Sequence, residues 1–336
     1  MLLGVDSHSL APDGGAGGAG TAGGSGGGAG TGGTGEIYGP ANCGADGSVV
    51  DGSEGDAGAG DAGTGANCGF TMPNPESSDP LLFPNQAKYH PNSDGTVDDL
   101  VTHLTWDRGT FQVFSQYEAD TPCKEKGGGW RLPNRVELAS LVDFTVPSPG
   151  PTLNQVFKND PTFGNPGDTK VFWTSSHAVC NTAIAWHVDF STGATKQEAA
   201  TLPYKVRCVK GAPSNCSSPR FEVQQDEVHD LGTGLIWQQA VASDLTWSAA
   251  LQHCPAGWRL PSLTEIQTIV DDTRQNPAIF PMFNNTSSGL NGTPNPVFWT
   301  SSPFAGDSSQ AWYDTFYHGH SSPQTVDLQS FVRCVR

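Results

Sequence analysis

Hydrophobic residues follow two patterns along the last third of the chain, and these patterns predict helices first and strands afterwards. Apolar residues recur at i, i+3, i+4 and i+7 at Trp247, Ala250, Leu251 and Cys254, which predicts one buried face of a helix. Residues 297–302 are instead aromatic and β-branched, a composition typical of strands. Helical spacing followed by strand composition indicates a mixed α and β fold.

One ten-residue stretch occurs twice and organises the rest of the chain. Residues 129–138 read GWRLPNRVEL, and residues 257–266 read GWRLPSLTEI. In the second stretch, Ser262 and Glu265 have the spacing of a capping box, in which each side chain satisfies a free backbone amide of the first helical turn. The first stretch has a weaker equivalent in Asn134 and Glu137. Both stretches therefore predict the start of a helix.

Further segments repeat in the same order, so the chain is a tandem duplication. Each predicted helix has a buried face, formed by Leu138, Leu141 and Val142 in one copy and by Ile266, Ile269 and Val270 in the other. The other matched segments are 97–106 with 228–237, 171–176 with 297–302, 185–190 with 311–316, and 206–209 with 332–335.

We expect the copies to be two domains, at 87–212 and 219–336, each with two helices and a small irregular antiparallel sheet. Each copy has roughly 115–125 residues, which is enough for its own core. A strand pair is expected at the start of the first copy, because the turn at 92–95 ends in Asp94 and Gly95. The first helix of that copy is less regular, and we place its apolar face at Phe111, Phe114 and Tyr117.

The N-terminal region has a different composition. Residues 11–35 are almost entirely Gly, Ala, Ser and Thr, without large apolar side chains, so we expect residues 1–86 to be a disordered, acidic stalk. The glycine spacing is irregular and proline is nearly absent there, which excludes a collagen helix. After the stalk, the loops at 145–170 and 272–296 are long enough to be functional.

Charge narrows the possible partners. The net charge is −17, and residues 1–86 hold ten acidic residues and no Lys or Arg. Binding to nucleic acid or to an anionic membrane needs a basic surface, so neither is expected as a partner. No segment approaches the length of a membrane-spanning helix.

Eight cysteines without metal-binding spacing predict an oxidised, exported protein. The repeat positions predict the bridges Cys123–Cys208 and Cys254–Cys334, each closing a loop of about 80–85 residues. The remaining pairs are then expected to be Cys180–Cys216 and Cys43–Cys68. The first five residues do not form a signal peptide, so we expect a trimmed or misplaced start, as in a lipoprotein whose anchor region has been lost.

The order of these motifs resembles a known bacterial family. A TGLxW-like segment, a cysteine, GWRLP, FWTSS, AW and VRCV are together similar to the Lcl C-terminal domain, named after a Legionella collagen-like adhesin, in two copies over about 240 residues. The resemblance implies a surface protein with a role in adhesion or glycan binding. A more distant similarity to C-type-lectin-like and sulfatase-modifying-factor domains implies an irregular α+β fold. The adhesin relative is associated with trimerisation and with binding of sulfated glycosaminoglycan. The stalk here lacks collagen periodicity, which argues against trimerisation by that route. The second copy lacks Lys, which argues against a sulfate-binding surface there, whereas the first copy, with eight Lys, could keep one.

Candidate chemistry is sparse. The Ser-rich triplets at 174–176 and 300–302 lack a G-x-S-x-G context and share no aligned His, so no catalytic residue is assigned. The turn at 92–99 lacks the first acid and closing Glu of an EF-hand, so no metal and no cofactor is expected. We place a possible sugar-stacking surface at Trp186, His187, Trp312, Tyr313, Tyr317 and His318.

Several matched residues are interpreted as structural. They flank the helix starts and the closing strands, and we expect Arg207 to pair with Glu137 and Arg333 with Glu265. The full set is Trp130, Arg131, Glu137, Arg207, Trp258, Arg259, Ser262, Glu265 and Arg333.

The sequence therefore predicts a non-enzymatic, exported or cell-surface binding protein, whose partner is a polysaccharide or an envelope protein. A structural or protein-interaction module of the cell envelope, without a small ligand, is the first alternative. An enzyme related to the sulfatase-modifying factors is the second, and it would need reactive cysteines near the C-terminus.

Overall fold

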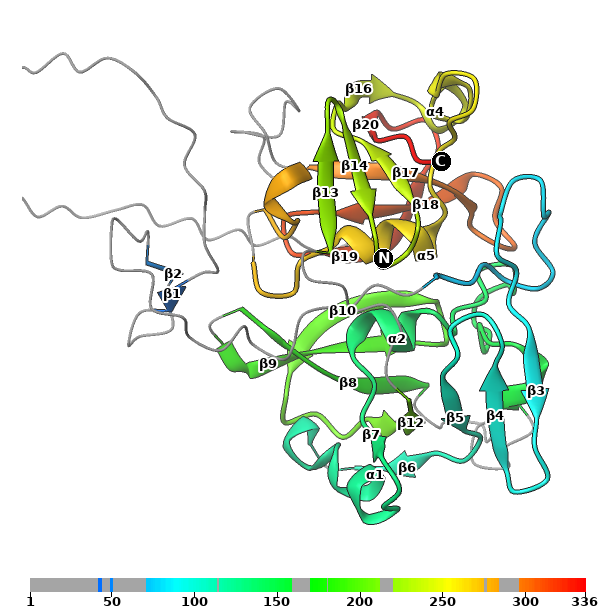
Figure 1. The fold of residues 1–336 in the computed structure, drawn as a ribbon, viewed down its shortest axis with the longest axis vertical. Coiled ribbons are helices and arrows are strands. Elements are labelled where there is room, and N and C mark those ends of the chain that lie inside the picture. Colours follow the sequence, from blue (N-terminus) through cyan, green and yellow to red (C-terminus); the bar gives the residue numbers. More distant parts are fainter. Residues whose placement is uncertain are drawn as a thin grey trace, which may run out of the picture. The chain divides into compact units, whose positions relative to one another are not determined.

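The computed structural model describes residues 71–113, 115–158, 170–179, 181–211, 220–274, 277–283 and 296–336, together with the backbone of β1 (Asn42–Cys43) and β2 (Val49–Val50). These residues form a mixed α+β fold of small sheets and few short helices (Figure 1). The expected bridges Cys180–Cys216 and Cys43–Cys68 involve side chains outside the described residues.

The first copy is built from two five-stranded sheets. One has the order β3-β4-β5-β12-β7 and the other β10-β9-β8-β11-β6. The first sheet contains β3 (Tyr89–Pro91), β4 (Thr96–Asp99), β5 (Thr105–Asp107), β12 (Val209–Lys210) and β7 (Trp130–Arg131). The second contains β10 (Ala194–Ala199), β9 (Asn181–Asp189), β8 (Val171–Ala178), β11 (Lys205–Val206) and β6 (Phe111–Gln112).

The second copy has a similar arrangement. Its sheets have the orders β13-β14-β15 and β16-β20-β17-β18-β19, and Val335 bridges Trp237 to Arg259 much as β12 joins β5 to β7. The strands are β13 (Phe221–Gln224), β14 (Glu227–Asp230), β15 (Ile236–Gln238), β16 (Ala242–Leu245), β20 (Ser330–Val332), β17 (Val297–Pro303), β18 (Gln310–Thr315) and β19 (His320–Thr325). Only antiparallel pairing was expected, but β11–β8 and β17–β20 are parallel.

The predicted helix starts are confirmed. In α2 (Arg135–Ala139), the Asn134 side chain accepts from the Glu137 amide at 2.8 Å, and the Glu137 carboxylate accepts from the Asn134 amide at 2.9 Å. The same capping box, between Ser262 and Glu265, begins α5 (Leu263–Ile266). The other helices are α1 (Thr121–Glu125), α3 (Gln155–Lys158) and α4 (Trp247–His253), with 3₁₀ turns at Gln116–Glu118, Gln267–Ile269 and Pro281–Phe283.

The first helix of copy one is shorter than its counterpart, and its face differs from the prediction. Tyr117 is exposed, whereas Gln116, Ala119 and Cys123 are buried. Pro122 lies in the first turn of α1, where its missing amide proton costs nothing, so the segment breaks into a 3₁₀ turn and a short helix. In copy two, α4 is continuous, as predicted.

Both predicted bridges of the duplicated part are present, Cys123–Cys208 and Cys254–Cys334. The first bridge ties α1 to the segment after β11, and the second ties the end of α4 to the segment after β20. Cys208 and Cys123 are fully buried against Leu132 and Trp173, and Cys334 occupies the equivalent place in copy two.

The stalk ends earlier than expected, because residues 71–88 fold as a strap along both copies. Asn74 is fully buried; its amide nitrogen donates to Asn85 O at 3.1 Å, and its side chain accepts from Thr264 of copy two. Phe83 packs on Phe144, with ring centroids 5.4 Å apart. The apolar anchors of this segment distinguish it from the glycine-rich residues before it.

The two copies contact each other through equivalent elements. Strand β10 of copy one lies beside β19 of copy two, where the Thr195 amide donates to Ser321 Oγ at 3.0 Å. A side chain at Gly193 would meet Trp312 at 3.3 Å, and one at Gly319 would meet Trp186 at 3.3 Å. The matched tryptophan of each copy thus lies against a glycine of the other copy, which forms a roughly two-fold junction.

Candidate functional site

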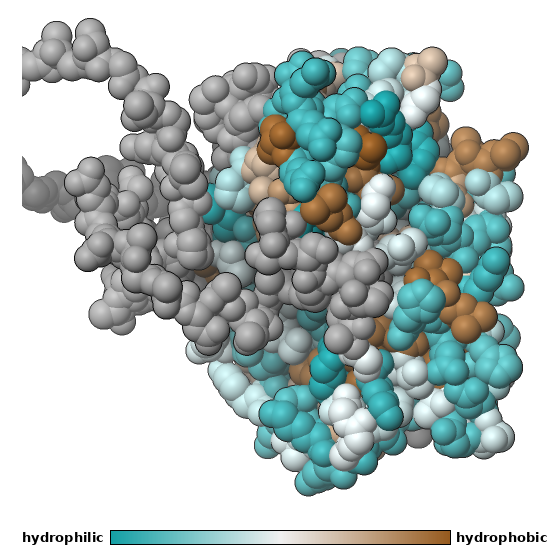
Figure 2. Space-filling model, viewed as in Figure 1, coloured by the Kyte–Doolittle hydropathy of each residue, from teal (hydrophilic) through white to brown (hydrophobic). Residues whose placement is uncertain are grey.

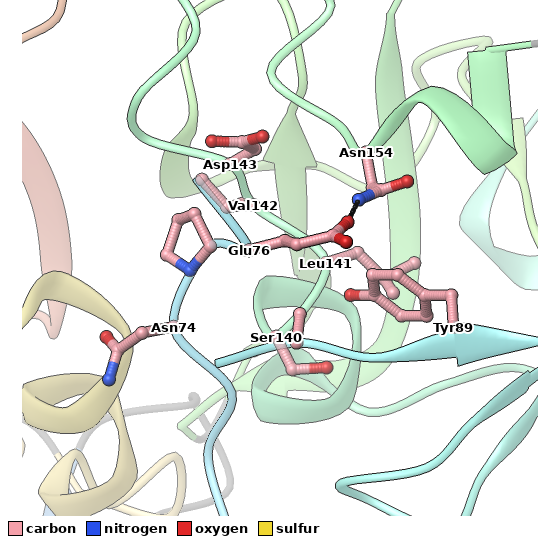
Figure 3. Close-up of a pocket in the computed structure, with 10 residues that line it drawn as sticks. Asn74, Glu76, Tyr89, Ser140, Leu141, Val142, Asp143 and Asn154 are labelled. Atoms are coloured by element: carbon pink, nitrogen blue, oxygen red, sulfur yellow. Dashed lines mark hydrogen bonds between the residues drawn. The ribbon is translucent and has the colours of Figure 1, made fainter. Parts of the chain in front are cut away.

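The described surface has a small concavity that cannot hold a ligand. It lies where the strap meets copy one, between Glu76, Tyr89 and Asn154 (Figure 3). The Asn154 amide donates to the Glu76 carboxylate at 2.8 Å. The space is about 10 Å³, which is the volume of one water molecule at most. Burial raises the pKa of Tyr89 well above its usual value, so its hydroxyl stays protonated.

The second concavity is an open groove of about 550 Å³ in copy one. Its walls combine carboxylates, hydroxyls, an amide, two ammonium groups and one indole. We call it the copy-one groove, and its lining residues are Asn92, Asp94, Thr96, Asp98, Thr105, Lys126, Trp130 and Lys210.

Strand register explains why these side chains meet. Asp98 on β4 is paired with Thr105 on β5, Thr105 with Lys210 on β12, and Lys210 with Trp130 on β7. Side chains directly opposite each other in adjacent strands lie on the same face of a sheet. The four residues therefore form one row across the sheet. Alternate positions on the same strands point the other way into the core, namely Val97, Trp106 and Val209.

Hydrogen bonds hold the acidic end of the row in place. Asp98 accepts from Thr105 Oγ1 at 2.8 Å and from the Asn92 side-chain amide at 3.0 Å. Asp94, in the hairpin turn, accepts from the hydroxyl and the amide of Thr96. The hydrogen bond from the Thr96 side chain lowers the pKa of Asp94, so this exposed carboxylate is ionised at neutral pH.

At the other end of the row, Lys126 and Lys210 lie near the Trp130 indole. The Lys126 ammonium lies 5.3 Å from the centre of the Trp130 ring and pairs with Asp107 at 2.8 Å. Lys210 is exposed, and no carboxylate of the described residues pairs with it. Trp130 itself is partly buried against the cluster around Cys123 and Cys208.

In copy two, side chains at the equivalent row positions already contact one another. The equivalent residues are His229, Ile236, Arg336 and Trp258, from the matching strand pairs and hydrogen bonds. Arg336 lies 4.5 Å from the Trp258 ring centre and pairs with Glu227 at 2.8 Å. The indole of copy two is therefore covered by an arginine that is already paired, and Ile236 replaces the hydroxyl of Thr105.

The sugar-stacking surface expected at the late strands is wrong for its three central residues. Trp186 and Trp312 are each 1% exposed, because the two copies pack together over these side chains, and His187 is 4% exposed, because it packs on Trp173 and Tyr204 of its own copy. A ring this deeply buried has no face for a ligand. Tyr313, Tyr317 and His318 are partly buried, and the rings of Tyr317 and His318 contact each other at 4.3 Å.

Two expected ion pairs are also wrong. Glu137 pairs with Arg131 at 2.6 Å, and Glu265 pairs with Arg259 at 2.6 Å, so each capping glutamate takes the arginine of its own GWRLP stretch. Arg207 instead donates to the carbonyls of Asp107 and Arg108. Arg333 similarly donates to the carbonyls of Gln238, Gln239 and Phe283.

The Ser and Thr triplets have structural contacts. Thr174 Oγ1 donates to Trp186 O, and Thr300 Oγ1 donates to Trp312 O, both at 2.9 Å. Ser176 Oγ accepts from the Arg135 amide at the start of α2, and Ser302 Oγ accepts from the Leu263 amide at the start of α5. Across the residues that the structure describes, no three His, Cys, Asp or Glu side chains are grouped for a metal ion.

His320 at the junction predicts acid sensitivity. Burial first, and then the nearby charges of His318, His187, Lys196 and Arg135, lower its pKa from 6.5 to about 4. His320 therefore binds its proton at a higher pH in the unfolded chain than in the folded one. As a result, the free energy of unfolding falls as the pH drops from 6.5 towards 4. Between pH 7 and pH 4.5, the protonation of His320 lowers the free energy of unfolding by about 2.5 kcal/mol.

The variant His320→Gln is expected to lose about 2.5 kcal/mol less than the unmodified protein over that pH range, measured by urea unfolding at pH 7 and pH 4.5. Two other buried groups titrate nearby, His187, with a pKa of about 4, and Asp314, whose pKa burial raises. Both remain in the variant, so the difference between the two proteins reports the loss that depends on His320. An equal acid loss in the two proteins would contradict the assignment.

The sequence had suggested only part of the groove. Sequence patterns assign Trp130 a structural role and the turn at 92–99 a place in a hairpin, and they do not single out Thr105, Lys126 or Lys210. The two copies differ at the positions of Asp98, Thr105 and Lys210, and this difference could have pointed to a site in copy one. The strand register is needed to see that these positions form one row.

Comparison with known proteins gives one family. A search of curated proteins found no match. A family model, the Lcl C-terminal domain, matches residues 95–210 and again residues 226–336. The two matches cover most of the chain and coincide with the two copies, each with its GWRLP capping box and its bridge. The chain therefore belongs to the Lcl C-terminal domain family and carries two tandem copies of that domain.

Proposed function

We propose that the protein is a non-enzymatic, exported or cell-surface binding protein that recognises carbohydrate through the copy-one groove. The main support for this proposal is the row of Asp98, Thr105, Lys210 and Trp130, which presents hydrogen-bonding groups beside an indole in an open groove. Sugars offer hydroxyl groups that both donate and accept, together with apolar ring faces that pack on aromatic side chains.

Two further observations support this proposal. The two bridges are compatible with an oxidising, extracellular environment. Each copy has short helices and small sheets, which is consistent with a C-type-lectin-like fold, and we include that fold in the proposal. Among the described residues, every helix is too short or too polar to span a bilayer.

The described surface does not favour a broad apolar docking site. Apart from the adjacent pair Leu81 and Leu82, the exposed large apolar side chains come from separate segments, for example Leu100, Val223 and Leu328. Figure 2 shows apolar residues as small patches among polar ones. Polar recognition in a groove is therefore the better supported mode of binding. Copy two, with its row filled by Arg336, Glu227 and Trp258, is proposed to support copy one structurally.

The test uses the two equivalent tryptophans. We expect Trp130→Ala to reduce binding on an array of polysaccharides at least tenfold, because it removes the apolar platform of the groove. Trp258→Ala, the matched change in copy two, is expected to leave binding unchanged. Lys210→Ala alters only an exposed side chain, so it tests the groove without a risk to folding.

Equal losses in both tryptophan variants would place the binding site elsewhere. Absence of binding by the unmodified protein at low and physiological salt would favour a structural or protein-interaction module of the envelope instead.

A further inference from the structure

We infer that the copy-one groove selects an uncharged glycan and discriminates against sulfated or carboxylated ones; this rests on the proposed function. The inference comes from the balance of charge in the groove and from the hydrogen-bonding groups that remain available there. It concerns the class of sugar rather than the place where it binds.

The groove has no surplus of positive charge. The Lys126 ammonium is already neutralised by Asp107 at 2.8 Å. Lys210 is then opposed by two carboxylates in the same groove, Asp94 and Asp98. An anionic polymer binds where cations outnumber anions, and here the ratio is reversed.

The available hydrogen-bonding groups suit hydroxyl groups instead. The Asp94 oxygen that accepts from Thr96 leaves the second oxygen of that carboxylate facing solvent, because the side chain is fully exposed. Asp98 has both oxygens within hydrogen bonds, to Thr105 and Asn92, which fixes its orientation. Together with the Lys210 ammonium, the two carboxylates provide hydrogen-bond acceptors and a donor within one groove, as two neighbouring sugar hydroxyls require.

The experiment compares uncharged and sulfated polysaccharides on the full chain. The uncharged probes are dextran, mannan and galactan, and the sulfated ones are dextran sulfate and heparin, each at 50 and 500 mM NaCl. We expect binding to at least one uncharged probe, with a Kd that changes less than twofold between the two salt concentrations.

The variant Asp94→Asn separates the two classes by the direction of its effect. For an uncharged glycan, it removes a charge-assisted hydrogen bond, and the Kd is expected to rise about tenfold. For an anionic glycan, it removes a repulsion, and the Kd would fall. Asp226→Asn, in the matching hairpin of copy two, makes the same change in net charge and serves as the control.

Three outcomes distinguish this inference from the proposed function. Binding only to dextran sulfate or heparin, lost at 500 mM NaCl, would overturn the inference while keeping a glycan-binding protein. Tighter binding by Asp94→Asn would overturn it as well. No binding to any of the five probes would overturn both the inference and the proposed function.

Discussion

Replacing Arg135 by Leu, the residue found at the equivalent position of copy two, is expected to lower the free energy of unfolding by about 3–5 kcal/mol, because it leaves buried carboxylates without their cation. Arg135 begins α2 of copy one but is fully buried against copy two. Its guanidinium pairs with Asp272 at 2.5 Å and donates to Gln267 O at 3.0 Å. Gln267 in turn donates to Asp314, which is fully buried as well.

Urea unfolding followed by circular dichroism measures this loss. The double variant Arg135→Leu with Asp272→Leu is expected to recover part of the stability, because it removes the uncompensated charge together with its partner. A loss below 1 kcal/mol in the single variant would show that the copies do not pack together as described.

Removing the bridge of copy two, as Cys254→Ala with Cys334→Ala, is expected to cost about 4 kcal/mol through the entropy that the unfolded chain regains. The bridge spans 80 residues, and the equivalent bridge Cys123–Cys208 spans 85, so the matching variant of copy one should lose a similar amount. Thermal unfolding with and without a reducing agent checks this. An unmodified protein whose unfolding temperature is insensitive to reduction would contradict it.

The duplication could be predicted because its signals are local. The capping boxes at Asn134 and Ser262 depend on a spacing of three residues, and the helix α4 depends on a period that a short window contains. The two bridges followed because Cys123 and Cys254 recur at the same place in each repeat. Strong local rules and repetition reinforced each other in these elements.

The parts that sequence patterns did not predict depend on contacts between distant segments. Trp186 and Trp312 lie in segments whose sequence favours strands with outward-facing aromatic side chains. In the structure, each tryptophan is covered by a glycine turn of the other copy. The folding of the strap depends on Asn74 and Phe83 meeting both copies. The row from Asp98 to Trp130 depends on a register across four strands, of which β12 is far in sequence from the other three. No local spacing encodes such pairings.

The central claim is that copy one binds glycan while the equivalent row of copy two does not. Two-dimensional NMR of the indole N–H groups tests it most directly, with the nine tryptophan signals assigned by single substitutions. Titration with fragments of the uncharged polysaccharide that binds best is expected to shift the Trp130 signal and to leave the Trp258 signal unmoved. A shift at Trp258 with none at Trp130 would contradict the account.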